Sequence, residues 1–220
     1  MRQLALDLAT APEPTFDTFI PGRNLEALTH LQTAVAARGE RFIYLWGEPG
    51  CGRTHLLRAA AAAAAPHATY VACKADSAFV DAAPLLAADD VAFLGIEAQV
   101  ALFNRYNALR EQRGALITSG PMPPAQLALR ADLQSRLSWG LVLQLHALND
   151  DEKMLALTQH ASARGFSLTQ DVLAYLLTHT PRNMGDLFAT LDALDRHSLE
   201  TKRAVTVPLL RDFLRNDKDQ

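Results

Sequence analysis

The sequence predicts an α/β protein in which a parallel sheet flanked by helices is followed by a small all-α domain. Apolar runs typical of buried strands alternate with helical segments over residues 16–147, and such alternation implies right-handed crossovers between parallel strands. A glycine-rich turn joins the first of these strands to its helix. After residue 147 only helical patterns follow. We therefore expect an N-terminal segment over 1–15, an α/β core over 16–147 and a helical domain over 148–220.

Each expected element has its own local signal. Five short apolar runs have the length of buried strands: Phe42–Trp46, Thr69–Cys73, Leu85–Asp89, Ala115–Ser119 and Leu141–Leu145. Apolar residues at helical spacing predict helices of the core at Leu25–Ala37, His55–Ala65 and Glu97–Arg113. The same pattern predicts four more helices, at Asp150–Arg164, Thr169–Thr178, Asn183–Leu199 and Val207–Asn216. Asn24 and Thr206 are suited to cap the helices that follow them.

Composition narrows the class of protein. The 220 residues are 49% hydrophobic and 20% charged, which is typical of a globular protein. With 21 Lys and Arg against 24 Asp and Glu, the net charge of −3 argues against a surface built wholly to bind nucleic acid. Two cysteines provide neither a disulfide framework nor a four-ligand zinc site. Because no bilayer-spanning run or targeting segment is recognisable, a cytoplasmic protein without membrane contacts is expected.

The strongest chemical motif is Gly47-Glu-Pro-Gly-Cys-Gly-Arg-Thr54, which follows the phosphate-loop pattern GxxxxGK[ST] with arginine in place of lysine. Its glycines allow backbone N–H groups to turn toward phosphate oxygens, and the following helix adds positive potential. Thr54 offers a hydroxyl to Mg²⁺, while Arg53 keeps the positive charge on a wider, planar group. Cys51 lies where a helix N-terminus can lower a thiol pKa, although a small neutral filler is the preferred interpretation.

Acids at the ends of strands are the candidate partners of this loop. Asp89 ends a strand and is suited to the Mg²⁺ side of a nucleotide site, with Asp90 placed to orient a water molecule. A rival interpretation extends a strand over 91–96 and ends it at Glu97. Ser119 ends the next strand, where its hydroxyl either senses a γ-phosphate or caps a turn.

Three further segments admit two interpretations each. The segment Phe16–Asn24 either wraps an adenine or forms a hydrophobic staple with a helix cap. Arg136, near a helix end, either interacts with the helix dipole or projects as an arginine finger toward a neighbour's nucleotide. The N-terminal Gln3-Leu-Ala-Leu-Asp-Leu8 is either a plain strand or a short anchor on the proline-containing tether that follows it.

Together these segments resemble the AAA+ family and, within it, the DnaA-related replication proteins. The resemblance covers nearly the whole chain. It depends on Thr54-His55-Leu56 after the loop, on Phe16, Phe19, Gly22 and Asn24, on Ser135-Arg136-Leu137-x-Trp139-Gly140, on Pro123-Pro124-x-x-Leu127 and on Leu191-Asp192-x-Leu194-Asp195-Arg196.

The resemblance implies a regulatory role. Family members of this kind carry ADP and act with the sliding clamp loaded on DNA to promote hydrolysis of ATP held by DnaA, which restrains replication initiation. The implied nucleotide-binding residues are Gly22, Asn24, Gly47, Gly50, Cys51, Gly52, Arg53, Thr54, His55 and Arg182. The implied catalytic residues are Arg136, Asp89, Asp90 and Ser119, with Thr54 and Asp89 on the Mg²⁺, and the implied clamp-binding residues are Gln3, Leu4, Leu6 and Leu8.

Departures from the family pattern shape the remaining expectations. Gly185 stands where the lid helix usually has a nucleotide-contacting arginine, leaving Arg182 as a substitute, so weak or no intrinsic hydrolysis is expected. The chain ends about where the lid should end, so no DNA-binding domain is expected. Pairing of a nucleotide face with an arginine face would also allow a homo-oligomer. The alternatives are a self-contained ATPase of helicase-loader type and a nucleotide-binding scaffold.

Overall fold

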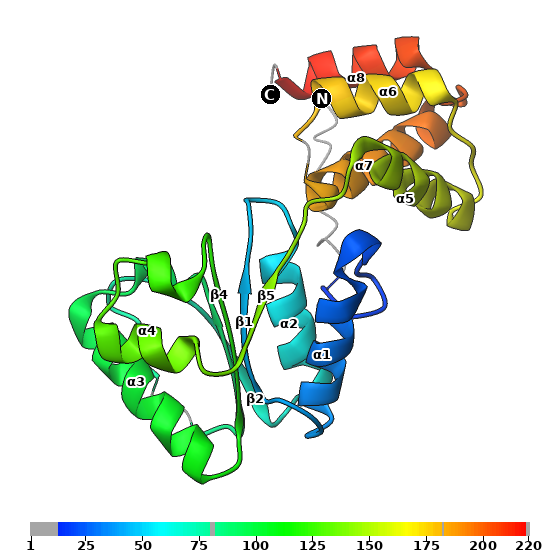
Figure 1. Cartoon of the computed structure of the whole chain (residues 1–220). Coiled ribbons are helices and arrows are strands. Elements are labelled where there is room, and N and C mark those ends of the chain that lie inside the picture. The colour runs from blue at the N-terminus through cyan, green and yellow to red at the C-terminus, as the bar shows by residue number, and fades with distance from the viewer. Residues whose placement is uncertain (1–12, 80–81, 182, 219–220) are drawn as a thin grey trace, which may run out of the picture. The chain divides into compact units, whose positions relative to one another are not determined.

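The computed structural model describes residues 13–79, 82–181 and 183–218, which form two compact units. The first unit spans Pro14–Ala147 and the second begins at Leu148 (Figure 1). Across these described stretches, none of the helices has the length and apolar character needed to span a membrane.

A five-stranded sheet forms the centre of the first unit, with strand order β2-β3-β4-β1-β5. Every paired strand is parallel, which confirms the predicted sheet type. The strands are β1 Phe42–Trp46, β2 Ala68–Ala72, β3 Leu85–Asp89, β4 Ala115–Gly120 and β5 Leu141–Gln144, each within one residue of the expected run. β3 and β4 are buried along their whole length, as expected for inner strands of a sheet covered on both faces.

Helices cover both faces of this sheet (Figure 1). On one face lie α1 (Leu25–Val35) and α2 (Arg53–Ala63); on the other lie α3 (Ile96–Glu111) and α4 (Ala131–Leu137). The alanines of α2 permit close packing, and Ala60 is fully buried against the sheet. Short 3₁₀ turns η1 (Gly22–Asn24), η2 (Val91–Phe93) and η3 (Pro124–Gln126) complete the unit.

Several helix ends differ from the sequence-based expectation. α1 stops at Val35 and α3 at Glu111, because Ala37 and Arg113 adopt left-handed backbone conformations with φ of 56° and 57°. α2 begins at Arg53 rather than His55, directly after the left-handed Gly52, so the first helical turn includes the end of the glycine-rich loop.

The structure distinguishes between the two interpretations of the segment that contains Asp89 and Asp90. β3 ends at Asp89, and Asp90 turns the chain with φ 58° and ψ 62°. Residues 91–93 then form η2 rather than a strand, so the interpretation that ended a strand at Glu97 is wrong. Glu97 instead lies in the first turn of α3.

The second unit is a bundle of four helices: α5 Asp150–Ala163, α6 Gln170–His179, α7 Met184–Thr201 and α8 Val207–Lys218. Leucines from all four helices fill its core, among them Leu157, Leu176 and Leu191. Asn149 forms a capping box with Glu152 at the start of α5. α5 and α7 are joined by the pair His160–Asp192, at 2.6 Å.

Candidate nucleotide-binding site

The glycine-rich loop connects the carboxyl end of β1 to the first turn of α2, the expected strand–loop–helix arrangement. A Cβ atom at Gly47 would overlap the carbonyl oxygen of Leu145, so only glycine fits where the loop leaves the sheet. Gly50 and Gly52 have φ of 81° and 100°, conformations that other residues rarely adopt. Thr54 is exposed in the first turn of α2, where its hydroxyl is accessible.

The segment before α1 lies over this loop. The Phe19 ring is 2.7 Å from the position that a Cβ of Gly52 would occupy. His55 binds the same segment through Nε2, which lies 2.9 Å from the carbonyl oxygen of Thr15 and 3.4 Å from Oγ1 of Thr18. Burial lowers the pKa of His55, and its contact with Thr15 acts in the opposite direction. The proposed adenine segment therefore packs directly against the phosphate loop and the first turn of α2.

The Asn24 side chain does not cap α1 as predicted but binds a distant part of the backbone. It makes no side-chain capping hydrogen bond to α1. Its Nδ2 instead donates to the carbonyl oxygen of His146 and its Oδ1 accepts from the His146 N–H, both at 2.8 Å. Because Asn24 is buried, these two bonds fix the entry to α1 against the chain that follows β5. Gly22, with φ 45°, opens the turn that delivers Asn24 to this position.

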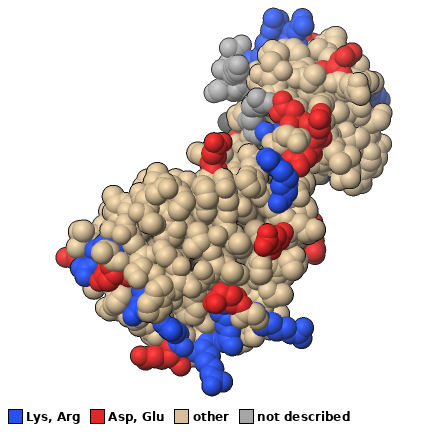
Figure 2. Space-filling model, viewed as in Figure 1, with Lys and Arg blue, Asp and Glu red and all other residues tan. Residues whose placement is uncertain are grey.

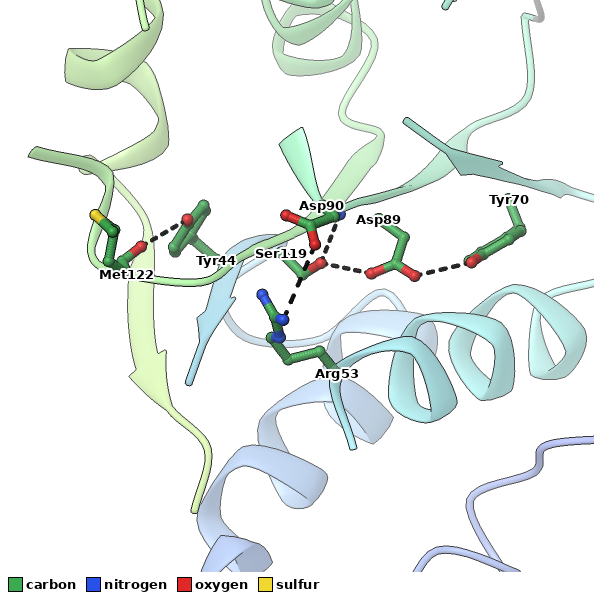
Figure 3. Close-up of polar contacts among 7 residues, drawn as sticks. All are labelled: Tyr44, Arg53, Tyr70, Asp89, Asp90, Ser119 and Met122. Atoms are coloured by element: carbon green, nitrogen blue, oxygen red, sulfur yellow. Dashed lines mark hydrogen bonds and ion pairs between the residues drawn. The ribbon is translucent and has the colours of Figure 1, made fainter. Parts of the chain in front are cut away.

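A chain of hydrogen bonds connects the two acids with neighbouring strands (Figure 3). Ser119 Oγ donates to Asp89 Oδ1 at 2.6 Å and accepts from the backbone N–H of Asp90 at 2.8 Å. Tyr70 Oη donates to the other Asp89 oxygen at 2.9 Å. Ser119 therefore holds the acidic pair instead of capping a turn. Sequence reasoning missed Tyr70, whose only signal was its place on the strand that neighbours the acids.

Gly120, next to Ser119, is required by a close packing contact. A Cβ at this position would overlap the hydroxyl of Tyr44, which donates to the carbonyl oxygen of Met122 at 2.8 Å (Figure 3). Burial raises the pKa of Tyr44 well above its ordinary value, so this hydroxyl remains a donor.

Arg53 extends from the start of α2 toward the end of β3, where it meets Asp90 (Figure 3). Arg53 Nη2 is 3.9 Å from Asp90 Oδ2, and the two side chains are 13% and 29% exposed. Arg53 Nη1 and Asp90 Oδ1 are buried and have no hydrogen-bond partner among the described residues. Burial raises the pKa of Asp90, an effect that Arg53 opposes and Asp89 reinforces.

Both cysteines are buried structural residues. Burial raises the pKa of the Cys51 thiol, although the Arg53 charge and hydrogen bonds favour its thiolate. The buried Cys51 with its raised thiol pKa agrees with the preferred interpretation of this residue as a small neutral filler within the loop. Burial also raises the pKa of Cys73, to about 12.

These residues fit the phosphates of a nucleotide. The glycine-lined loop, the buried and unpartnered Arg53 Nη1 and the accessible Thr54 converge at the carboxyl end of β1. No group of three or more His, Cys, Asp or Glu side chains suited to a metal occurs in the described residues. Mg²⁺ at Thr54 and Asp89 would therefore need phosphate oxygens and water as further ligands.

Arg136 lies near the amino ends of the strands, whereas the phosphate loop follows the carboxyl end of β1. It occupies the last turn of α4, and its guanidinium stacks 4.2 Å from the ring centre of Trp139. The next residue, Gly140, passes so close to the carbonyl of Phe42 that a Cβ would overlap it, which places this corner at the start of β1. No carboxylate within the described part of the chain forms an ion pair with Arg136.

On the face shown in Figure 2, acidic and basic side chains are interspersed, with broad areas that carry neither. The predicted clamp-binding residues Gln3, Leu4, Leu6 and Leu8 and the predicted lid residue Arg182 lie outside the described residues. Gly185 is exposed in the first turn of α7, where a Cβ would contact only Asn183 Oδ1, at 3.4 Å.

Two family models match the chain. Residues 11–74 match the bacterial DnaA ATPase domain, which includes the phosphate loop and the segment over it. Residues 150–214 match the Hda lid domain, which covers most of the helical unit.

Solved structures share the fold. DnaA from Aquifex aeolicus bound to AMPPCP is 22% identical, with a TM-score of 0.71; the match covers 86% of this chain and 66% of that one, just under two thirds of its length. Domain III of Thermotoga maritima DnaA is 20% identical, with a TM-score of 0.71 and 92% and 98% coverage. A RuvB variant from Thermotoga maritima is 15% identical, with a TM-score of 0.64 and 90% and 70% coverage.

Proposed function

We propose that this chain, whose residues 11–74 match the bacterial DnaA ATPase domain and whose residues 150–214 match the Hda lid domain, is a DnaA-related AAA+ protein that acts as a negative regulator of replication initiation. In this proposal the protein carries ADP, docks on the sliding clamp loaded on DNA and stimulates hydrolysis of the ATP held by DnaA. Contact with DNA is then made through the clamp.

The position of Arg136 is the observation that carries this proposal. Its guanidinium has aromatic rings beside it and no carboxylate partner in the described residues. It also lies at the amino end of β1, whereas the phosphate loop follows the carboxyl end of the same strand. Four residue steps of a strand span roughly 13 Å. An arginine so far from its own loop is suited to act on a nucleotide held by another molecule.

The remaining residues divide the work. The loop residues and Thr54 hold the nucleotide with Mg²⁺, while Asn24 and the segment over the loop enclose its base. Gln3, Leu4, Leu6 and Leu8 dock on the clamp. Arg136 supplies positive charge to the transition state on DnaA, an effect worth roughly 10³–10⁵-fold in systems where an arginine is supplied by a partner.

The alternative is a self-contained ATPase of helicase-loader type. Asp90 favours it, because this carboxylate lies beside the phosphate loop with one oxygen free of hydrogen bonds among the described residues. Its contact with Arg53 and the glycine at position 185 favour retention of a nucleotide over turnover.

The test is conversion of DnaA-bound ATP to ADP, measured with DNA-loaded clamp in the presence and absence of this protein. We expect acceleration that requires the clamp and that Arg136→Ala abolishes. Arg110→Ala is the matched control. The Arg110 guanidinium also lies over Trp139, 5.0 Å from the ring centre, so this substitution removes the same charge from the same surface. Arg110→Ala should retain most of the acceleration.

Two results would contradict the proposal. Equal loss with both arginine variants would indicate a general need for positive charge rather than a finger. Absence of acceleration together with intrinsic ATP turnover that survives Arg136→Ala and is lost with Thr54→Ala would establish the self-contained ATPase instead.

A further inference from the structure

A small open pocket lies near the amino ends of the strands, at the other end of β1 from the glycine-rich loop. It has a volume of about 280 Å³ and is lined by Arg41, Phe42, Arg110, Arg113 and Gly114. The lining therefore contains three arginines and no acid. None of these arginines forms an ion pair with a carboxylate in the described stretches of the chain.

The pocket is built on a tight turn between α3 and β4. Gly114 is buried, and a Cβ there would overlap the carbonyl oxygen of Pro84 and the side chain of Leu109. Its N–H donates to the Leu109 carbonyl oxygen at 2.7 Å, and the preceding Arg113 has a left-handed backbone with φ 57°. The Arg41 guanidinium donates from Nη1 to the Arg113 carbonyl oxygen. The Arg41 side chain is thus held against the backbone of Arg113.

Most guanidinium donors of this pocket are free. Arg41 uses one of its five N–H groups on the Arg113 carbonyl, and its side chain makes no other hydrogen bond within the described residues. Arg110 also lines the pocket, but its guanidinium lies over Trp139, 5.0 Å from the ring centre. Arg41 and Arg113 are therefore the two arginines whose charge is available to a ligand.

The negative groups nearby leave the pocket positive. Glu40 Oε1 accepts from the backbone N–H groups of Arg41 and Phe42, at 2.8 and 2.9 Å, so it binds the backbone rather than a guanidinium. Glu111 is exposed and does not line the pocket. The carboxyl end of α3 adds the equivalent of about half a negative charge, less than one arginine offsets. Figure 2 shows basic side chains, with acids among them, at the lower end of the core, where α3 ends in Figure 1.

The size and charge of this pocket suit a phosphate group. Its volume is below the range of about 300–1,000 Å³ typical of pockets that enclose a whole small-molecule ligand, so it accommodates one anionic group rather than a nucleotide. Guanidinium groups bind phosphate through paired N–H donors. Two of them at one small opening suit the tetrahedral directions of phosphate oxygens better than a planar carboxylate.

We propose that Arg41 and Arg113 form a phosphate-binding site that is separate from the glycine-rich loop. Two sources offer this chemistry, the phosphodiester backbone of DNA and free pyrophosphate. The site goes beyond the proposed function, in which DNA is contacted through the clamp, because a backbone phosphate bound here is a direct, local contact with DNA. With a net charge of −3 on the whole chain, such a contact is weak and confined to the pocket.

The experiment measures binding of the full chain to a short labelled DNA duplex by fluorescence anisotropy at low salt, and to inorganic pyrophosphate by calorimetry. Mg²⁺ and ADP are present throughout to occupy the glycine-rich loop. We expect Arg41→Gln and Arg113→Asn each to weaken binding about fivefold in at least one arm. Asn is chosen at position 113 because it tolerates the left-handed backbone. If DNA is the ligand, each variant also lowers the salt dependence of binding by about one phosphate contact.

Lys74→Gln is the matched control, because Lys74 is exposed after the carboxyl end of β2 in the same unit and its loss changes the net charge equally. It should leave both arms unchanged. Loss of DNA binding in the pocket variants assigns the site to a phosphodiester, and loss of pyrophosphate binding alone assigns it to a free phosphate. Arg113→Asn keeps the test decisive if Arg41→Gln does not fold.

The inference is overturned if the unsubstituted chain binds neither ligand, or if folded pocket variants bind both as tightly as it does. Equal weakening by Lys74→Gln would also overturn it, since binding would then depend on net charge alone. Polyglutamate is titrated in parallel. Pocket variants that impair only polyglutamate binding would establish an acidic protein partner in place of a phosphate.

Discussion

One hydroxyl, that of Ser119, holds both acids of the site. It donates to Asp89 and accepts from the backbone of Asp90, and the side chain is fully buried. Ser119→Ala leaves a buried carboxylate oxygen and a buried N–H without this partner. We expect it to lower the free energy of unfolding of the core by about 1–3 kcal/mol.

Urea unfolding followed by tryptophan fluorescence measures this change in the first unit alone, because both tryptophans, Trp46 and Trp139, belong to it. Ser135→Ala is the control, since Ser135 is exposed on α4 of the same unit, and its effect should stay within about 0.5 kcal/mol. Equal stability of the Ser119→Ala protein and the unsubstituted protein would mean that the hydroxyl does not hold the acids.

At the scale of elements, α2 is fastened to the segment over the loop by His55, and this contact depends on pH. Burial lowers the pKa of His55 in the folded protein from the ordinary value of 6.5. The unfolded chain therefore binds the proton more readily. The stability contributed by neutral His55 is complete above pH 6.5 and is lost as the pH falls below 6.5 toward the folded-state pKa.

We therefore expect the free energy of unfolding of the core to decrease between pH 7.5 and pH 5.5 by more in the unsubstituted protein than in His55→Gln. Tryptophan-detected urea unfolding at both pH values gives this difference. His67→Gln serves as control, because His67 is exposed and lies outside the segment contact. An identical pH dependence for the unsubstituted and His55→Gln proteins would contradict the assignment.

Most of the secondary structure of the core could be predicted from the sequence, whereas its long-range contacts could not. Strand positions, the parallel sheet and the strand–loop–helix unit follow from apolar runs and glycine spacing, both of which are local signals. The Asn24–His146 and Tyr70–Asp89 contacts join residues far apart in sequence, and no local pattern indicates them. The position of Asn24 before a helix predicts a cap, because capping is a common local use of asparagine, whereas its partners in the structure are set by tertiary contacts. Burial of Cys51, which raises the pKa of its thiol, is likewise a tertiary effect.

At the scale of the whole core, the two arginines for which we propose functional roles lie at opposite ends of the strands of one sheet. Arg53 follows the carboxyl end of β1, and Arg136 lies where Gly140 meets the start of that strand. Substitutions more than about 7–10 Å apart without shared partners usually have additive effects. Nucleotide retention and action on a partner should therefore be separable by mutation.

Arg53→Ala should weaken ADP binding by roughly 10-fold to 100-fold, because it removes a charged hydrogen-bond donor from the loop. Arg136→Ala should leave the ADP dissociation constant within about twofold, and the double variant should match Arg53→Ala alone. Calorimetric titration of the three variants with ADP measures this directly. If Arg136→Ala weakened ADP binding as strongly as Arg53→Ala, Arg136 would belong to its own molecule's nucleotide site. Its position at the other end of the strands argues for the opposite result, in which a single fold keeps its own nucleotide at one end of the sheet and presents an arginine to another molecule at the other.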